Sequence, residues 1–378
     1  MLLPIFQSSF FQIDMPSITV NVKVFLNKMV IEGFNGGEQK VLEFVQTSYC
    51  IEWDYAISQN NQLSGFTLCQ YDQRQYQFEG EVQSVTGLRS VLKGKIGFFN
   101  WEKEFSFQKM IKKTEHCEIF QVLRGENLKV IKVLQDNKTN LELQVNHLLN
   151  QKPHVNLLHC DEFYMDEQQI YLVMDYHDSS LEDLQHEYSN KIIPLNIIRT
   201  ILQQLLEGLN HLHSNQIIHK DLKYGNILLT PNKTVKIFDF GLSQIGQNTT
   251  IRSGTGGYLA PEVFQNQPIT SKSDIFSLGV IFHKMLTGKG VFKNLNENMA
   301  GKMKISSQLK DKNAKDLLLS MLNQDPELRF TAEDCLAHPF FIGEYDKPSQ
   351  KICLSNYLSP LSQYKLYPQS TQIISLSL

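Results

Sequence analysis

Long hydrophobic runs, an excess of charge of one sign and paired cysteines are all missing from this sequence. No apolar run approaches the roughly 20 residues that cross a bilayer, and the apolar start, Met1 to Phe11, lacks the basic residues of a signal peptide. The net charge of −3 leaves no surplus of Lys and Arg to neutralise nucleic-acid phosphates. The six cysteines form no C-x-x-C pair, which argues against a disulfide framework or a metal-site spacing. We therefore expect a cytoplasmic protein with reduced cysteines, no transmembrane segment and no nucleic-acid partner.

The composition and the periodicity of the sequence divide the chain of 378 residues into four parts. After an N-terminal extension, residues 1–15, short alternating runs predict strands, and apolar residues at helical spacing predict a closing helix. Together they predict a small β domain over residues 16–95. Helical and strand patterns then alternate over residues 105–342. Residues 343–378 are rich in Ser, Gln and Pro and predict a flexible tail, whose apolar end either docks on the rest of the chain or is disordered.

The strongest chemical signal is the run from His219 to Asn226, followed by Asp239 within Asp-Phe-Gly. Asp221 can accept the proton of an attacking hydroxyl, and Lys223 can stabilise a transferring phosphoryl group. Asn226 and Asp239 carry oxygen ligands of the kind that Mg²⁺ prefers when phosphates complete its shell. The spacing of these residues places them on loops and predicts phosphoryl transfer.

In these motifs the sequence resembles the protein kinase family, over about residues 105–342. Further family markers follow in the expected order: Val130-Ile131-Lys132, Gly254 to Glu262, Ser273 to Gly279, and Asp325 to Arg329. The resemblance implies an α+β, bilobal kinase fold, with a small β-rich lobe, a large helical lobe, and ATP and Mg²⁺ bound between them. It also implies a protein substrate with a Ser or Thr acceptor, because Asp221-Leu222-Lys223 and Gly254-Thr255 resemble the Ser/Thr branch.

The resemblance assigns roles to individual residues. Asp221, Lys223 and Lys132 are the implied catalytic residues, and Asn226 and Asp239 the implied metal ligands. Lys132 would hold the α- and β-phosphates, and Glu142 would pair with it, although another register places Gln144 there instead. The remaining implied nucleotide-binding residues are Ile111 and Ile119 beside the phosphate-covering loop and Met174, Asp175 and Tyr176 at the adenine. His219 and Arg329 have structural roles in the family, Arg329 by pairing with Glu262.

The phosphate-covering loop departs from the family pattern. The three expected glycine positions fall on Lys112, Thr114 and Cys117, so side chains would crowd the phosphates and we expect weak nucleotide affinity. Lys220 also replaces the usual Arg before Asp221, and a Lys offers only a point charge to a phosphate. Phosphorylation in the presumed activation loop, at Thr249, Thr250 or Ser253, would therefore regulate the chain less strongly than in relatives that carry the Arg. The alternative interpretation is that these three are ordinary polar loop residues.

The resemblance favours a kinase similar to the calcium/calmodulin type. Two other functions stay open. The lost glycines favour a pseudokinase that acts as a binding or scaffold protein. A small-molecule phosphotransferase is disfavoured by Ala260-Pro261-Glu262, which belongs to peptide-binding kinases. The β domain resembles a pleckstrin-homology-like module, which implies docking to a membrane or protein; equally, it is a β domain without a ligand.

Overall fold

The computed structural model describes residues 3–13, 18–25, 27–34, 36–44, 49–56, 62–70, 73–114, 117–135, 141–166, 168–188, 190–230, 234–265, 267–307, 309–342 and 373–375. The chain forms two compact units. The first comprises residues 1–152 and 159–176, and the second comprises residues 153–158 and 177–378. Each unit is described separately.

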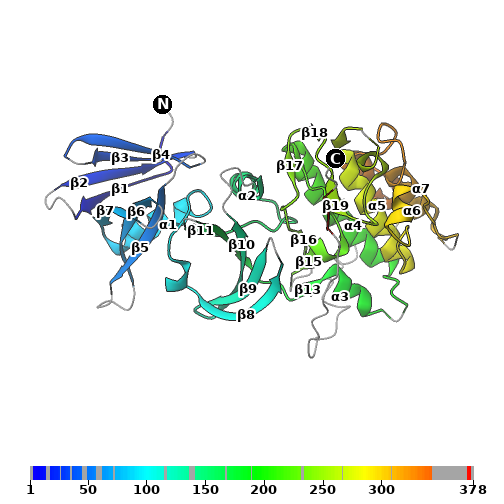
Figure 1. The fold of residues 1–378 in the computed structure, drawn as a ribbon, viewed down its shortest axis with the longest axis horizontal. Helices are drawn as coiled ribbons and strands as arrows, with labels where there is room; N and C mark the ends of the chain where they lie inside the picture. The colour runs from blue at the N-terminus through cyan, green and yellow to red at the C-terminus, as the bar shows by residue number, and fades with distance from the viewer. Residues whose placement is uncertain are drawn as a thin grey trace. The chain divides into compact units, whose positions relative to one another are not determined.

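The first unit begins with a seven-stranded antiparallel sheet (blue in Figure 1). Its strands are β1 (Phe6–Gln12), β2 (Thr19–Val24), β3 (Lys28–Phe34), β4 (Glu38–Glu43), β5 (Tyr49–Ala56), β6 (Gln62–Gln70) and β7 (Gln73–Glu79). They lie in the order β4-β3-β2-β1-β7-β6-β5. In β2 the buried Val20, Val22 and Val24 alternate with more exposed residues, as expected for a sheet with one face in a core.

Helix α1 (Val82–Leu92) follows the sheet and packs on β6 and β1. Its buried face carries Val85, Leu88 and Leu92, three and four residues apart, so the helical spacing in the sequence is confirmed. The strand order and the closing helix are consistent with the pleckstrin-homology-like prediction, which remains a prediction.

The predicted small lobe lies in the same unit. It contains η2 (Trp101–Lys103), α2 (Leu141–Gln151) and a five-stranded antiparallel sheet in the order β11-β12-β10-β9-β8. The strands are β8 (Ser106–Lys113), β9 (Glu118–Arg124), β10 (Asn127–Gln135), β11 (Glu162–Met165) and β12 (Gln169–Asp175).

One hydrophobic core runs through both sheets of this unit. Phe98 pairs with Ile51 of β5 on one side and with Tyr164 of β11 on the other. Its ring contacts the rings of Trp53 and Tyr164 edge to face, at centroid distances of 5.3 and 5.7 Å. The core contains buried side chains from both sheets, so the β domain and the small lobe stabilise each other.

A buried ion network crosses the same junction. Arg89 of α1 lies 2.5 Å from Glu104 and 3.1 Å from Glu162 of β11. Arg124 of β9 also contacts Glu104, and it lies 2.5 Å from Glu162. Burial alone would raise the pKa of the Glu162 carboxyl, but the hydrogen bond and charge of Arg124 and the charge of Arg89 lower this pKa to about 2.

The second unit is mainly helical. Its helices are α3 (Leu181–His186), α4 (Leu195–Ser214), α5 (Ser271–Thr287), α6 (Leu295–Met299), α7 (Lys312–Met321), α8 (Ala332–Leu336) and α9 (Pro339–Ile342), with the 3-10 turns η3 (Tyr224–Asn226) and η4 (Pro261–Val263). Its short strands are β13 (Ser179–Ser180), β14 (Ile217–Ile218), β15 (Ile227–Leu229), β16 (Val235–Ile237), β17 (Gln244–Ile245), β18 (Asn248–Thr249), β19 (Ser253–Thr255), β20 (Ile269–Thr270) and β21 (Ile373–Ser375).

Helices α4 and α5 provide the core of this unit. In α4 the residues Ile198, Ile201 and Leu205 are buried at helical spacing. Helix α5 begins where the Thr270 hydroxyl accepts a hydrogen bond from the Lys272 N–H, and it ends at Gly288, whose φ of 70° suits glycine. Strand β14 pairs with β17, and β15 pairs with β16. These pairs hold the ends of two loops, the one from β14 to β15 and the one from β16 to β17.

These elements confirm the predicted fold class: a small β domain with a C-terminal helix, a β-rich small lobe and a helical large lobe. Within the described part of the chain, every helix is too short or too polar to span a bilayer.

Candidate active site

Lys132 and Glu142 form a buried ion pair in the first unit. The Lys132 Nζ lies 2.6 Å from Glu142 Oε1, and the two side chains are 9% and 8% exposed. Lys132 lies on the central strand β10, and Glu142 lies in the first turn of α2. Gln144 is exposed on another face of α2. The structure therefore selects Glu142, and not Gln144, as the partner of Lys132.

The other predicted nucleotide-binding residues of this unit lie on three strands. Ile111 lies on β8, and Ile119 lies on β9, where its neighbours across the sheet are Lys112 and Lys132. Met174 is partly buried and packs on a small core cluster of Leu134, Cys160, Phe163, Ile170 and Leu172.

At the end of β12, Asp175 Oδ1 is 2.6 Å from the Nζ of Lys129. Tyr176 follows directly and is half-buried.

Thr114 and Cys117, at the two ends of the segment in place of the glycine-rich loop, are joined by hydrogen bonds. The N–H and the hydroxyl of Thr114 both donate to the carbonyl oxygen of Cys117, at 2.8 and 3.1 Å. An ion pair of 2.5 Å between Lys113 and Glu118 joins the strands beside it. Residues 115 and 116 lie outside the described residues. Because the Thr114 N–H already has an acceptor within the turn, it cannot also bind a phosphate in this conformation.

Asp221 is the centre of a buried polar cluster in the second unit. Its carboxylate accepts hydrogen bonds from Lys223 Nζ at 2.8 Å, from Asn226 Nδ2 at 3.1 Å and from the Thr255 hydroxyl at 2.5 Å. Lys223 also donates to the Thr255 hydroxyl at 2.9 Å. Lys223 and Asn226 belong to the run His219 to Asn226, here called the catalytic loop, and Thr255 belongs to β19. Donors from two segments that are 34 residues apart in sequence therefore fix the carboxylate.

Asn226 and Asp239 carry the oxygen atoms suited to a cation. The NH₂ group of Asn226 donates to the backbone oxygen and the carboxylate of Asp221, which leaves its amide oxygen as the group for a metal. Asp239 has a φ of 67°, a left-handed conformation that is uncommon for a residue with a side chain. One carboxylate and one amide oxygen fit Mg²⁺, which usually binds few protein ligands beside phosphates and water.

His219 supports these loops and takes no part in acid–base chemistry in this arrangement. Its Nδ1 accepts from the Asp221 N–H at 3.3 Å, so the proton lies on Nε2, which donates to the Phe238 oxygen at 3.1 Å. The ring of Phe240 lies 5.5 Å from the ring of His219. The structural role predicted for His219 is therefore consistent with its contacts.

Asp274 of α5 holds the backbone of the catalytic loop. Its carboxylate accepts from the N–H groups of His219 and Lys220, both at 2.9 Å, and contacts His213 Nε2 at 2.9 Å. Burial would raise the pKa of this carboxyl, but the hydrogen bond and charge of His213 outweigh burial and lower it.

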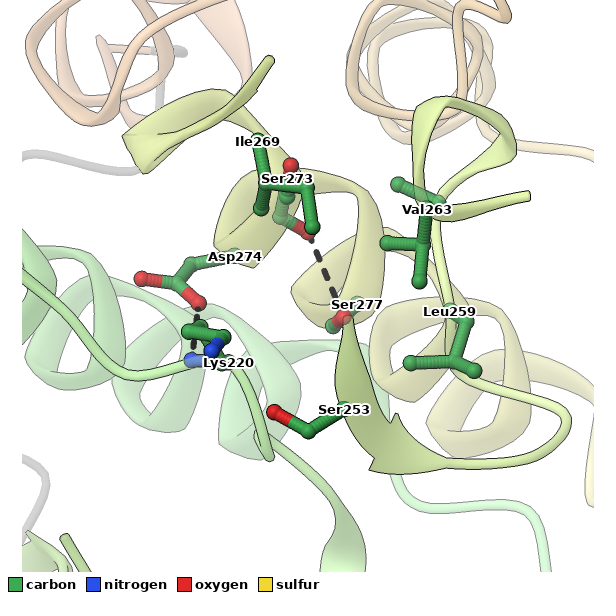
Figure 2. A pocket seen from close by; sticks show the side chains of 9 residues that line it. Lys220, Ser253, Leu259, Val263, Ile269, Ser273, Asp274 and Ser277 are labelled. Atoms are coloured by element: carbon green, nitrogen blue, oxygen red, sulfur yellow. Dashed lines mark hydrogen bonds between the residues drawn. The ribbon is translucent and has the colours of Figure 1, made fainter. Parts of the chain in front are cut away.

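Figure 2 shows Lys220 and Asp274 on one side of a small pocket, with Ser253, Leu259 and Ser277 around it. Burial lowers the pKa of the Lys220 ammonium to about 8, against the raising effect of the Asp274 carboxylate. Lys220 is thus a weaker cation than the Arg usual at this position, which is always charged.

The predicted partners Glu262 and Arg329 form a bidentate ion pair, and this prediction is confirmed. Arg329 donates to the two carboxylate oxygens of Glu262 at 2.6 and 2.9 Å, and both side chains are fully buried. Ser273 donates to the same carboxylate at 2.7 Å. Burial would raise the pKa of Glu262, but Arg329 lowers it overall. This pair ties the end of the activation segment to the helical core.

The three candidate phosphorylation sites differ in exposure. Thr249 is buried, and its hydroxyl accepts from the Ile251 N–H at 3.1 Å. Thr250 is exposed. The Ser253 hydroxyl is buried at the pocket of Lys220, with no hydrogen-bond partner among the described residues. Whether any of them is phosphorylated stays a prediction.

A small lobe with a buried Lys–Glu pair, and a helical lobe with an Asp-centred loop and a buried Glu–Arg pair, define the class of protein kinases. A family model of the protein kinase domain matches residues 109–341. The chain therefore belongs to the protein kinase family.

Several Ser/Thr kinases are similar to this chain. Serine/threonine-protein kinase PLK2 of Mus musculus is 31% identical over 238 residues, which are 60% of this chain and 34% of that protein. Serine/threonine-protein kinase 17A of Oryctolagus cuniculus is 34% identical over 220 residues, which are 53% and 54% of the two chains. Aurora kinase of Schizosaccharomyces pombe is 29% identical over 268 residues, 68% and 72% of the two. The chain thus spans about a third of the length of the first relative.

Proposed function

We propose that this protein is a Ser/Thr protein kinase that transfers the γ-phosphoryl group of ATP to a protein hydroxyl in a Mg²⁺-dependent reaction. The observation that carries the proposal is the carboxylate of Asp221, held by Lys223, Asn226 and Thr255. A carboxylate fixed in this way can orient an acceptor hydroxyl and take its proton. The Ser/Thr relatives support the choice of acceptor.

In the proposed reaction the acceptor oxygen forms a bond to the γ-phosphorus, and the bond from that phosphorus to the β,γ-bridging oxygen breaks. Asp221 takes the proton of the acceptor hydroxyl. Lys223, whose Nζ lies 2.8 Å from the Asp221 carboxylate, stabilises negative charge on the group in transfer. Lys132, oriented by Glu142, binds the α- and β-phosphates. Asn226 and Asp239 would hold Mg²⁺, and the bound ion would supply positive charge to the phosphates.

The turn at Thr114 favours a second candidate function, that of a pseudokinase. None of the three expected positions carries a glycine, and the Thr114 N–H is bonded to the Cys117 oxygen and so is not available to a phosphate. A chain that lacks such donors can keep the kinase fold and act as a binding or scaffold protein without transferring phosphate. We favour the kinase because the residues that perform the chemistry are present and arranged around Asp221.

The test is ATP- and Mg²⁺-dependent transfer of labelled phosphate to the chain itself and to generic protein acceptors. We expect phosphoserine or phosphothreonine to form, and transfer to be lost in Asp239→Ala, because this variant lacks one of the proposed metal ligands. Small-molecule acceptors provide the comparison for the disfavoured phosphotransferase function.

Thermal unfolding with and without Mg·ATP completes the test. No transfer, together with no rise in Tm on addition of Mg·ATP, would contradict the proposal and support the pseudokinase. Transfer by the wild-type chain but not by Asp239→Ala would show that the glycines are dispensable in this protein.

A further inference from the structure

Helix α6 has a single buried side chain, and that side chain is polar. Asn298 is 2% exposed, whereas Met299 beside it is 52% exposed. A helix on the surface of a protein normally contacts the core through apolar side chains. Burial of a side-chain amide is favourable only when its hydrogen bonds are made, so the partners of Asn298 explain how α6 is held.

The amide of Asn298 bridges two residues of the segment that leads to Glu262. Its Oδ1 accepts from the Gly257 N–H at 3.0 Å, and its Nδ2 donates to the Leu259 carbonyl oxygen at 2.8 Å. One backbone group is a donor and the other an acceptor, so a side-chain amide can satisfy both at once, in this orientation only.

The backbone between these two contacts is also fixed. Ser277 of α5 donates to the Tyr258 carbonyl oxygen at 2.8 Å. The chain turns here, because the Tyr258 N–H donates to the Thr255 oxygen at 3.3 Å and Gly257 has a φ of 89°, which residues with a side chain rarely adopt. Side chains from two helices therefore hold residues 257–259 in an unusual conformation.

This fixed backbone follows directly on the proposed base. Thr255, two residues before Gly257, donates to the Asp221 carboxylate at 2.5 Å. A protein acceptor with its hydroxyl at Asp221 extends by roughly 3.3–3.6 Å per residue to each side. Its neighbouring residues therefore reach the backbone that follows Thr255, and the conformation of residues 257–259 contributes to the affinity for the acceptor.

We propose that Asn298 is a positioning residue for the protein acceptor, which holds residues 257–259 in the conformation that receives the acceptor chain beside Asp221. It acts through the backbone of Gly257 and Leu259 and does not touch the reacting atoms. This inference rests on the proposed kinase function. It adds a residue outside the catalytic loop on which acceptor affinity depends.

The test compares steady-state kinetics of the wild-type chain with those of Asn298→Ala, which loses both hydrogen bonds, and Asn298→Asp, which has nearly the size of Asn but no donor for Leu259. The Asp variant tests the same claim if the Ala variant fails to fold. Asn296→Ala is the matched control, because Asn296 is exposed on the same helix. The acceptors are casein, which is acidic, and myelin basic protein.

We expect the KM for both acceptors to rise about 5–150-fold in the two Asn298 variants and to stay unchanged in the control. The KM for ATP should not change in any of them. Without nucleotide, the amide of Gly257 should exchange its hydrogen faster in Asn298→Ala than in wild type or in Asn296→Ala.

The outcomes separate this inference from the proposed kinase function. If the wild-type chain transfers phosphate, an unchanged acceptor KM in the Asn298 variants would overturn the positioning role and leave the kinase function in place. This holds even if kcat or Tm falls or the Gly257 amide exchanges faster, because a purely structural role predicts those changes too. No transfer by the wild-type chain would refute the kinase function and, with it, the positioning role.

Discussion

At the residue scale, the environment of Asp221 depends on a hydroxyl from outside the catalytic loop. Thr255 donates to one carboxylate oxygen of Asp221 and accepts from Lys223, so it fixes both side chains. In Thr255→Val this hydrogen bond is lost at nearly constant volume, while Thr255→Ser keeps it. We expect kcat to fall about 5–150-fold in the Val variant, from the 1–3 kcal/mol that a buried unpaired polar group costs. Steady-state kinetics of both variants test this, and equal kcat values for Val and wild type would contradict it.

The buried pair of Lys132 and Glu142 leads to a second prediction. Replacing Glu142 by Gln removes the carboxylate that lies 2.6 Å from the buried Lys132 ammonium, and breaking a buried ion pair costs about 3–5 kcal/mol. We expect Glu142→Gln to lower both the Tm and kcat/KM. Gln144→Ala on the exposed face of the same helix is the matched control and should change neither. A larger loss in the Gln144 variant would show that the pairing is misassigned.

Sequence reasoning identified the members of the catalytic loop because their chemistry is carried by a short run, His219 to Asn226. It named Glu142 but left Gln144 open, since residues two apart on a helix differ only in the face they present. The role of Thr255 was not predictable, although Gly254-Thr255 resembles the Ser/Thr branch, because contact with Asp221 requires two segments far apart in the sequence to converge. The requirement for a small residue at Gly254 also depends on that approach.

At the scale of elements, α1 joins the β domain to the small lobe through Arg89. This guanidinium contacts Glu104 and Glu162. Lys93, directly after the helix, lies 3.0 Å from Glu162, and its side chain is 43% exposed. We expect Arg89→Leu to destabilise the chain by about 3–5 kcal/mol, because two buried carboxylates lose a partner. Lys93→Ala should cost no more than about 1 kcal/mol, as exposed ion pairs do.

Urea unfolding of Arg89→Leu and Lys93→Ala provides the measurement. Equal losses of unfolding free energy would contradict a buried network at this junction. A larger loss of unfolding free energy in Arg89→Leu than in Lys93→Ala would show that contacts with the β domain stabilise the small lobe.

The helix itself was predictable from its apolar spacing, and so was the presence of a β domain before it. The ion network was not, because its members come from α1, β9, β11 and the segment before β8, and no local pattern joins them. Docking of the tail was also not predictable from the local sequence. Its apolar end was compatible with docking or disorder, and only the register of β21 on β19 favours docking.

At the scale of the whole molecule, buried carboxylates make the free energy of unfolding depend on pH in the acid range. The pKa values of Glu162, Glu262 and Asp274 are all lowered in the folded state by their cationic partners. For Glu162 the pKa falls from 4.5 to about 2. The unfolded chain therefore binds protons first as the pH drops. The stabilisation is complete above about pH 4.5 and is lost between about pH 4.5 and pH 2.

Urea unfolding at pH 7, 5, 4 and 3 measures this loss. Glu162 alone accounts for about 3 kcal/mol, and the pH dependence should be weaker in Glu162→Gln. A free energy of unfolding that stays constant from pH 5 to pH 3 would contradict the assignment of these carboxylates.

The most direct measurement for the whole account is the turnover of Asp221→Asn. Asn is similar in size to Asp but cannot take the acceptor's proton, so we predict a loss of phosphoryl transfer on the order of 10²–10⁴-fold. The Tm should fall, because the buried ion pair of Asp221 with Lys223 is lost, and Mg·ATP should raise the Tm of both proteins equally. Turnover within a few fold of wild type in a pure preparation would contradict the role of Asp221 as the base.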